Sequence, residues 1–307
     1  MKKPITIIFG MLCAVIMLAG IGRPLPARSQ AMERDRARNQ PVAPFRIMGN
    51  LYYVGASDIT SFLIVTPKGN ILLDAGFLET VTQIQANVKT LSFRLEDTKF
   101  LLNSQAHFDH TGGLAQLKKL TGAQMVASEE DALMLESGGR GDPYFGDKYV
   151  FPPVQVDRRL QNGETVSLGG TVMTAEITPG HTRGCTTWTM SAEDAGKPYH
   201  AVFVCSTSVL PEIRLIDNAQ YPGIERDYEY TFRRLRQLPC DIFLGAHGNF
   251  FDLLAKTERL RRGDKPNPFI DPEGYKKYLD SSEAAFQKEL RVQRAAVSRP
   301  PADKPHP

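Results

Sequence analysis

The strongest constraint on the fold is a short run of metal-binding side chains placed directly after an apolar, strand-like segment. The run is Gln105-Ala-His107-Phe-Asp109-His110-Thr-Gly-Gly113, and it follows Phe100–Leu102. In an extended segment residues two apart point to the same side, so Gln105, His107 and Asp109 are expected to face one centre. The glycine pair allows a sharp turn into a helix, from which His110 would point toward a second centre. The spacing therefore predicts two adjacent metal sites.

Polar side chains also follow several other strand-like segments. Each of five residues stands just past the end of an apolar segment: Asp74, His181, Ser206, Ser208 and His247. Loops at strand ends, held by a rigid sheet, are where active sites tend to lie. A lone histidine is as often a core or surface residue as a ligand. Beside the run, however, His181 and His247 each supply an imidazole that a complete metal site needs.

The chemistry of these side chains favours zinc. Imidazole and carboxylate groups suit Zn²⁺, and two zinc ions would polarise a substrate carbonyl and supply hydroxide near neutral pH. The sequence contains no Gly-x-Ser-x-Gly motif and no Walker or dinucleotide-binding glycine motif. Serine-based catalysis and nucleotide binding are therefore not indicated.

Strand-like segments with a few helices occur roughly twice over, in residues 45–136 and 160–260. Several strands are joined by short hairpins, such as the one that turns at Gly49-Asn50. This order predicts two sheets packed together with helices outside, and it argues against a parallel doubly wound sheet. The expected strands are 62–65, 70–73, 100–102, 125–127, 164–167, 171–177, 185–190, 201–205 and 241–244, and the expected helices are 78–92, 113–120, 129–136, 226–237 and 272–292.

Both ends of the chain are expected to lie outside the folded domain. Lys2 and Lys3 precede an apolar run over 5–21, which is typical of a secretory signal peptide, with a cleavage site at Ser29-Gln30-Ala31. A membrane anchor is the alternative, because the run is at the short edge of what spans a bilayer. We expect export to the periplasm and the following divisions: a signal peptide over 1–31, a loose N-terminal arm over 32–44, one domain over 45–295 and a disordered tail over 296–307.

The charge balance excludes one class of partner. Residues 1–31 carry four basic side chains and no acidic one, so the remaining chain has 33 basic and 34 acidic residues. A chain with no basic field is not expected to bind nucleic acid.

A long loop over 137–153, rich in glycine, proline and aromatic residues, completes a pattern that resembles a known family. The chain resembles the metallo-β-lactamase superfamily over residues 45–290, and within it the third lactamase subclass. This resemblance implies an α+β fold in which two mixed sheets pack face to face with outer helices, as a four-layer αββα sandwich. It rests on the metal-binding run and on Leu73–Gly76, Gly138–Asp147, Pro179–Gly184 with Trp188, Ser206–Ser208 and Ala246–Gly248.

The resemblance implies a set of six zinc ligands. The first zinc would be held by Gln105, His107 and His181, and the second by Asp109, His110 and His247. Asp109 would also be a catalytic residue, since a bridging hydroxide would attack the β-lactam carbonyl while zinc stabilises the leaving ring nitrogen.

The resemblance also implies roles around these ligands. Asp74 would brace the ligand loop. Ser206 and Ser208 would help to place the substrate carboxylate or a water, and Phe145 with its loop would cover the substrate.

Gln105 departs from the family pattern, which usually has histidine at this position. An amide oxygen is a weaker zinc ligand than an imidazole. Our hypothesis is that the first site binds zinc less tightly than the second and that the enzyme with one zinc is active.

The cysteines form a second departure. Cys185, Cys205 and Cys240 lie beyond the signal segment, and because three cannot all pair, at least one is a free thiol or a ligand. Another lactamase subclass uses a cysteine ligand near Cys205, but the serine match places Ser206 there, so Cys205 is expected to be a small buried residue at a strand end. Cys240 resembles a family cysteine that pairs with a later one, and that disulfide should be missing because no cysteine follows it.

Related hydrolases share the metal-binding run, including glyoxalase II, lactonases and phosphodiesterases. Most of them use an additional aspartate that bridges both metals, where this chain has Val204-Cys205-Ser206. We therefore expect a monomeric, exported zinc β-lactamase that hydrolyses penicillins, cephalosporins or carbapenems and confers antibiotic resistance. Its partner would be a small molecule, with no membrane contact after signal cleavage. The alternatives are a lactone or thioester hydrolase of the same fold and a zinc-binding protein without catalysis.

Overall fold

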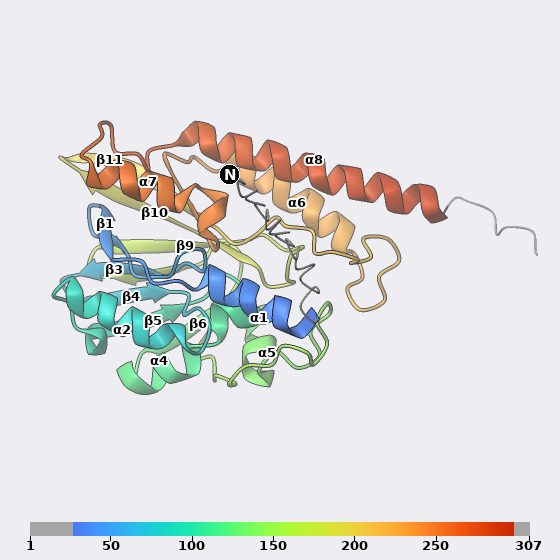
Figure 1. Ribbon diagram of the computed structural model, residues 1–307, viewed down its shortest axis with the longest axis horizontal. Helices are drawn as coiled ribbons and strands as arrows, with labels where there is room; N and C mark the ends of the chain where they lie inside the picture. The colour runs from blue at the N-terminus through green and yellow to red at the C-terminus, as the bar shows by residue number, and fades with distance from the viewer. Residues whose placement is uncertain (1–26, 298–307) are drawn as a thin grey trace, which may run out of the picture.

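The computed structural model describes residues 27–297, which form two sheets packed face to face with helices outside them (Figure 1). The first sheet has seven strands in chain order. Strands β1 to β4 are antiparallel neighbours, whereas β4 to β7 run parallel to one another. The strands are β1 (Phe45–Met48), β2 (Leu51–Tyr53), β3 (Phe62–Thr66), β4 (Gly69–Leu73), β5 (Thr98–Leu102), β6 (Gln124–Ser128) and β7 (Arg158–Leu160).

The second sheet has five strands in the order β12-β11-β10-β9-β8. Its neighbours are antiparallel except for the pair β11 and β12, which is parallel. Both sheets are thus mixed, as predicted. The strands are β8 (Thr165–Leu168), β9 (Thr171–Ile177), β10 (Thr186–Asp194), β11 (Lys197–Val204) and β12 (Ile242–Gly245).

The first sheet is buried on both faces, because successive apolar side chains of its inner strands point to opposite faces and both sets are covered. In β3, Phe62 and Ile64 pack toward the second sheet, where the Phe62 and Phe203 rings lie 5.0 Å apart, while Leu63 packs toward the outer helices. Each such buried side chain contributes about 1.5–3 kcal/mol. The helices on this face are α2 (Thr80–Thr90), α4 (Leu114–Thr121) and α5 (Glu129–Ser137), with the short η1 (Leu95–Asp97) beside them.

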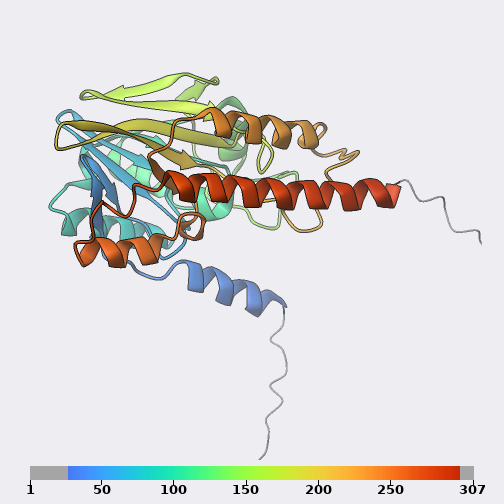
Figure 2. The same ribbon diagram turned by 90° about the horizontal axis from the view of Figure 1, so that it is seen from above.

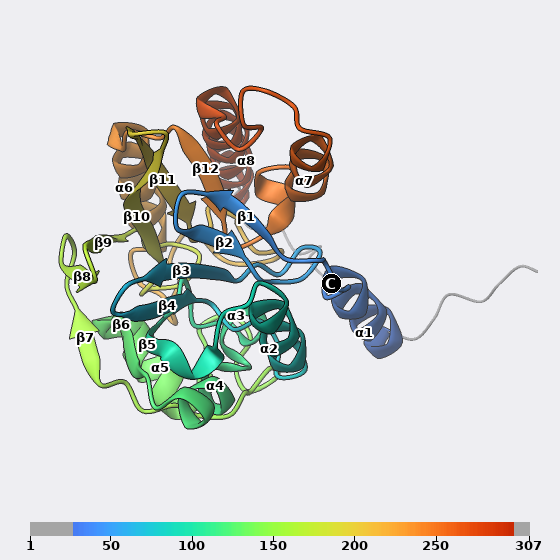
Figure 3. The same cartoon turned by 90° about the vertical axis from the view of Figure 1, so that its left-hand side faces the viewer.

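The second sheet is covered by the helices of the C-terminal half (Figures 1 and 3). Tyr228 of α6 and Phe286 of α8 stack with ring centroids 5.2 Å apart, and Tyr275 of α8 packs on Phe243 of β12. These helices are α6 (Ile224–Gln237), α7 (Leu253–Arg261), preceded by η2 (Gly248–Phe250), and α8 (Pro272–Val297). The predicted four-layer αββα sandwich is confirmed.

The N-terminal segment differs from its prediction. Residues 32–38, expected to belong to a loose arm, form the second half of helix α1 (Ala27–Arg38), which lies outside the two sheets (Figure 2). The proposed signal peptide falls largely on residues 1–26, outside the described residues, as does the tail beyond Val297. No helix within residues 27–297 is long and apolar enough to cross a membrane.

Strand directions bring the predicted site residues to one edge of the sandwich. In the first sheet, the parallel strands β4 and β5 end at Leu73 and Leu102. In the second sheet, β9, β11 and β12 run in one direction and end at Ile177, Val204 and Gly245. The loops that follow these five ends carry Asp74, the metal-binding run, His181, the two serines and His247.

Candidate metal centre

The loop after β5 is held from both sheets before it reaches the histidines. The backbone N–H and the hydroxyl of Ser104 each donate to the Asp74 carboxylate at 2.7 Å. From the second sheet, the Trp188 indole N–H donates to the Asn103 carbonyl at 2.9 Å, and the Thr186 N–H donates to the Ser104 carbonyl at 2.7 Å. Asp74 therefore anchors the start of the loop that carries the candidate ligands, through its two hydrogen bonds with Ser104.

The metal-binding run is extended only as far as His107. His107 has φ −89° and ψ 151°, and the next four residues form helix α3 (Phe108–Thr111). The expectation that Gln105, His107 and Asp109 face one centre through strand alternation is therefore wrong. The helical turn instead groups Asp109 with His110, and it separates them from His107.

Asp109, His110 and His247 form a compact cluster. Ligand atoms of the three side chains all lie within 4.8 Å of one another. The Nε2 atoms of His110 and His247 are 3.3 Å apart, and His110 Nε2 lies 3.6 Å from Asp109 Oδ1. Converging imidazole nitrogens with one carboxylate form a donor set that suits zinc, so this cluster could hold a metal ion.

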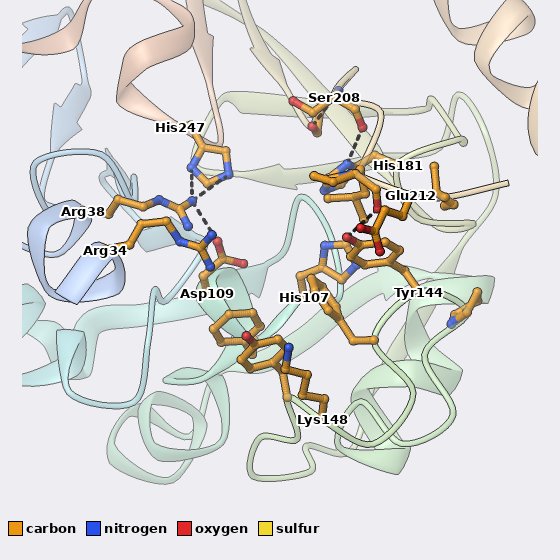
Figure 4. A pocket seen from close by; sticks show the side chains of 18 of the residues that line it. Arg34, Arg38, His107, Asp109, Tyr144, Lys148, His181, Ser208, Glu212 and His247 are labelled. Carbon is orange, nitrogen blue, oxygen red and sulfur yellow. Dashed lines mark hydrogen bonds and ion pairs between the residues drawn. The ribbon is translucent and has the colours of Figure 1, made fainter. Parts of the chain in front are cut away.

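His107 and His181 form a second pair beside this cluster (Figure 4). Their ring centroids are 4.8 Å apart. Gln105, two residues before His107, is fully buried, and within residues 27–297 neither its amide oxygen nor its amide nitrogen has a hydrogen-bond partner. A buried amide without partners costs about 1–3 kcal/mol. A metal ion bound to the amide oxygen would offset part of this cost, so the residues present fit a metal here too.

The His181 ring is oriented by the loop after β11. Its Nδ1 lies 2.8 Å from the Ser208 carbonyl, so Nδ1 carries the proton and Nε2 keeps its lone pair for a metal. Burial and the neighbouring His107 lower the pKa of His181 to about 3, which keeps the imidazole neutral. The preceding Gly180 has φ +134°, and a Cβ atom there would lie 2.9 Å from the Tyr228 ring, so this turn requires glycine.

Two carboxylates that were not predicted also contact the histidines. Asp142 Oδ2 lies 3.5 Å from His107 Nε2, and Asp58 Oδ2 lies 3.3 Å from His247 Nδ1. Burial would raise the pKa of Asp58, but hydrogen bonds from His247 and the Asn249 N–H outweigh it and lower the pKa to about 2. Both aspartates lie far from these histidines in the sequence, so the contacts can be recognised only in the folded structure.

Asp109 stays ionised in spite of its burial. Burial alone would raise its pKa, but His110, His247 and Arg38 hold it well below its usual range. In the same way burial would lower the pKa of His110, but Asp109 and Asp74 outweigh it and raise the pKa. The Asp109 carboxylate of the cluster is therefore negatively charged, and this charge favours binding of a cation.

Arg38, at the end of α1, also reaches this cluster and was not predicted. Its Nη2 lies 3.0 Å from Asp109 Oδ2 and 2.9 Å from His247 Nδ1 (Figure 4). Its Nε donates to Asp58 Oδ2 at 3.1 Å. The contact depends on the helix that replaces the expected loose arm.

The two groups of ligands open onto one cavity of about 810 Å³. The loop over 137–153 forms part of its wall: the Phe145 ring lies 5.0 Å from the His107 ring, and the Tyr144 hydroxyl donates to the Pro211 carbonyl at 2.8 Å. Ser206 and Ser208 also line the cavity. Its positive side chains are Arg34, Arg38, Lys148 and Arg214 and its negative ones Asp58, Asp109 and Glu212. Since Arg38 is paired with Asp58 and Asp109, Arg34, Lys148 and Arg214 are the side chains that could attract an anionic group.

The cysteines do not reach the ligands. Cys205 is fully buried at the end of β11 and forms a disulfide with Cys185, while Cys240 is a free thiol. A sulfur in a disulfide has no thiolate to offer a metal. Cys205 is therefore buried at a strand end as expected, and in addition it ties the loop after His181 to the loop that carries Ser206.

Solved structures similar to this chain cover nearly all of its described fold. The FEZ-1 metallo-β-lactamase of Legionella gormanii is 46% identical, and the match covers 83% of this chain and 98% of that one with a TM-score of 0.82. BJP-1, a subclass B3 metallo-β-lactamase of Bradyrhizobium japonicum, is 38% identical, with 85% and 98% of the two chains covered and a TM-score of 0.79.

Curated relatives match more weakly. An acyl-coenzyme A thioesterase, MBLAC2 of Gallus gallus, is 30% identical over 182 residues, which are 52% of this chain and 58% of that protein. A probable metallo-hydrolase of Burkholderia pseudomallei is 27% identical, with 51% and 53% covered. The chain thus spans little more than half the length of these relatives. The family model described as the metallo-beta-lactamase superfamily matches residues 54–247, and the chain therefore belongs to the metallo-β-lactamase superfamily.

Proposed function

We propose that the protein is an exported, zinc-dependent β-lactamase that opens the cyclic amide of penicillins, cephalosporins or carbapenems and so confers antibiotic resistance. One observation carries the proposal. Two groups of candidate ligands, Asp109 with His247 and His107 with His181, line a single cavity in a fold shared with a β-lactamase that is 46% identical. The subclass B3 neighbours support a β-lactam over other substrates.

In this proposal six side chains hold two zinc ions, and the cluster of Asp109, His110 and His247 and the pair of His107 and His181 support the division. Gln105, His107 and His181 would hold the first zinc, and Asp109, His110 and His247 would hold the second. Bound zinc supplies Lewis acidity and an activated water.

The protein's own groups complete the site. The ionised Asp109 carboxylate would orient the attacking water by accepting a hydrogen bond from it. Ser206, Ser208 and the positive side chains of the cavity would bind the substrate carboxylate. The aromatic wall formed by Tyr144 and Phe145 would hold the bicyclic substrate over the ligands and exclude bulk water.

Hydrolysis of a chromogenic cephalosporin by the purified protein tests the proposal. We expect turnover that a chelator abolishes and added zinc restores. Expression in a susceptible bacterium, with and without residues 1–31, tests export and resistance together, because only the exported protein would raise the tolerated antibiotic concentration. Intact zinc binding without turnover of any β-lactam would contradict the proposal.

A thioester hydrolase is the second candidate, because one curated relative is an acyl-coenzyme A thioesterase. The chain has Val204-Cys205-Ser206, with Cys205 tied to Cys185, in the segment where most such hydrolases of the superfamily would have a bridging aspartate. We therefore expect acyl-coenzyme A and acylglutathione thioesters to be poor substrates. Faster cleavage of a thioester than of any β-lactam would favour this second candidate.

A further inference from the structure

The Arg38 guanidinium lies on the ligands of the proposed second zinc. Its Nη2 atom is within hydrogen-bond distance of Asp109 Oδ2 at 3.0 Å and of both ring nitrogens of His247, at 2.9 and 3.3 Å. Guanidinium groups have only donors, so Arg38 needs a lone pair on the His247 ring. The Nδ1 atom also lies 3.3 Å from Asp58 Oδ2, and Nε2, the second ring nitrogen within reach of Arg38, faces His110 Nε2 at 3.3 Å. Arg38 thus uses the same carboxylate and the same imidazole as the metal would.

A guanidinium and a zinc ion would compete for this carboxylate and this imidazole. Both are cations, and two cations bound to the same side chains of a largely buried site repel each other. We propose that Arg38 competes with zinc for Asp109 and His247 and that zinc binding displaces it, so that helix α1 lowers the affinity of the protein for its second zinc.

The backbone beside Arg38 is fixed, so that its side chain is held within reach of the site. The Arg38 carbonyl accepts from the N–H groups of Asp58 and Ile59 at 2.9 and 3.2 Å and from the Ser57 hydroxyl at 3.0 Å. The Asn39 side chain accepts from the Thr80 hydroxyl at 2.8 Å. Zinc binding at the second site therefore requires the Arg38 side chain to move further into the cavity, while its backbone hydrogen bonds stay in place. The side chain is already 25% exposed.

This competition changes the expected balance between the two zinc sites. Gln105 weakens the first site through its chemistry, whereas Arg38 weakens the second by competing for its ligands. Without Arg38 the difference in affinity between the sites should widen. The inference rests on the zinc site of the proposed function and not on its substrate.

Zinc affinity at the second site alone tests the inference. All variants carry His181→Ala, which removes an imidazole from the first site, and the dissociation constant is measured by competition with a chromogenic zinc chelator. Arg38→Ala should tighten zinc binding about tenfold to a hundredfold, because zinc no longer competes with charged hydrogen bonds. Arg36→Ala is the matched control: Arg36 lies on the same helix, carries the same charge and is exposed, and its removal should leave the constant unchanged.

Two results would overturn the inference: equal zinc affinity with and without Arg38, or equal tightening by Arg36→Ala, which would point to net charge alone. If the His181→Ala background does not fold, native mass spectrometry of otherwise unchanged chains makes the same comparison. The one-zinc species, in which the tighter second site is filled, should then form at lower free zinc in Arg38→Ala than in the chain that keeps Arg38, and formation at equal free zinc contradicts the competition.

Nuclear magnetic resonance of the Arg38 side chain gives a readout independent of affinity and of catalysis. The ¹⁵N–¹H signal of its Nε group, assigned by its loss in Arg38→Ala, should shift as zinc is added, because competition is reciprocal. A signal that stays unchanged while zinc fills the second site contradicts displacement. If no variant binds zinc, both this inference and the proposed function fail, whereas zinc binding that is insensitive to Arg38 removes this inference alone.

Discussion

At the scale of single residues, each histidine of the candidate centre has a ring nitrogen within 3.6 Å of an oxygen atom from another loop. Such partners fix the ring and its tautomer, and their loss typically weakens metal binding about tenfold to a hundredfold. The partners lie far from the histidines in the sequence, so the metal-binding run alone does not reveal them. The pairs are His107 with Asp142, His110 with Asp74, His181 with the Ser208 carbonyl and His247 with Asp58.

Gln105→His should tighten zinc binding at the first site. An imidazole is a better zinc ligand than an amide, and the position is already buried and without a protein partner among the described residues. We expect a gain of about tenfold or more in affinity, measured by zinc titration of the protein followed by hydrolysis of a chromogenic cephalosporin. Gln105→Ala should have the opposite effect, and unchanged titration curves for both variants would show that residue 105 is not a ligand.

Asp142→Asn should weaken the first site by releasing His107. The Asp142 carboxylate contacts the His107 ring and also accepts the N–H groups of Tyr144 and Phe145, so it couples the ligand to the cavity wall. We expect zinc affinity to fall about tenfold. Asp147→Asn is the control, because Asp147 accepts only the Gly141 N–H in the same loop. An equal loss in both variants would mean that the loop, and not the contact with His107, is responsible.

The sequence predicts the candidate ligands but not their geometry. The residues Gln105 to His110 were found because ligand-type side chains follow an apolar strand, and that signal is local. Their orientation was mispredicted because helix α3 begins at Phe108, directly after His107. Arg38 was missed for another reason: its contacts with Asp58, Asp109 and His247 depend on a helix that docks from outside the domain.

At the scale of elements, hydrophobic periodicity predicted most strands and helices, because β3, β9, β12 and α6 each bury one clear face or a continuous apolar run. Helix α1 was not predicted because its residues 33–38 are mostly charged and present no apolar face. Strand β7 was missed as well, since Arg158 and Arg159 do not resemble a strand. Such elements depend on tertiary contacts that a local pattern does not contain.

The disulfide between Cys185 and Cys205 should stabilise the arrangement of two site loops. It closes a loop of 20 residues in sequence, for which chain entropy predicts about 3 kcal/mol. Replacing both cysteines with alanine should therefore lower Tm by roughly 6–12 °C in calorimetry under oxidising conditions. Cys240→Ala, which removes only the free thiol, should change Tm much less. A Tm that is the same with and without the disulfide would show that the loops are held by other contacts.

At the scale of the whole molecule, one buried carboxyl should control how stability changes with pH. Asp131 lies beneath the ligand loops, where it accepts from the side chains of Asn103 and Thr182. Burial raises the pKa of Asp131 to about 7. The folded protein therefore holds a proton there that the unfolded chain loses above pH 3.8.

Between about pH 4 and 7 the folded state binds more protons than the unfolded state at Asp131, so this group makes stability fall as pH rises. The full effect is on the order of 4 kcal/mol. Asp131→Asn should remove this slope in unfolding of the metal-free protein by urea, and so gain stability relative to the unchanged chain as pH rises. Glu130→Gln, an exposed neighbour on α5, should keep the slope. Parallel pH profiles for Asp131→Asn and the unchanged chain would contradict this assignment.

The chain contains a single tryptophan, Trp188. It is wholly buried between the sheets, and its indole N–H is bonded to the Asn103 carbonyl at the start of the loop that carries Gln105 and His107. All indole fluorescence therefore arises from one point directly behind the metal loop. The protein has a built-in optical reporter, and its emission wavelength and lifetime should follow any displacement of that loop in real time without an added dye.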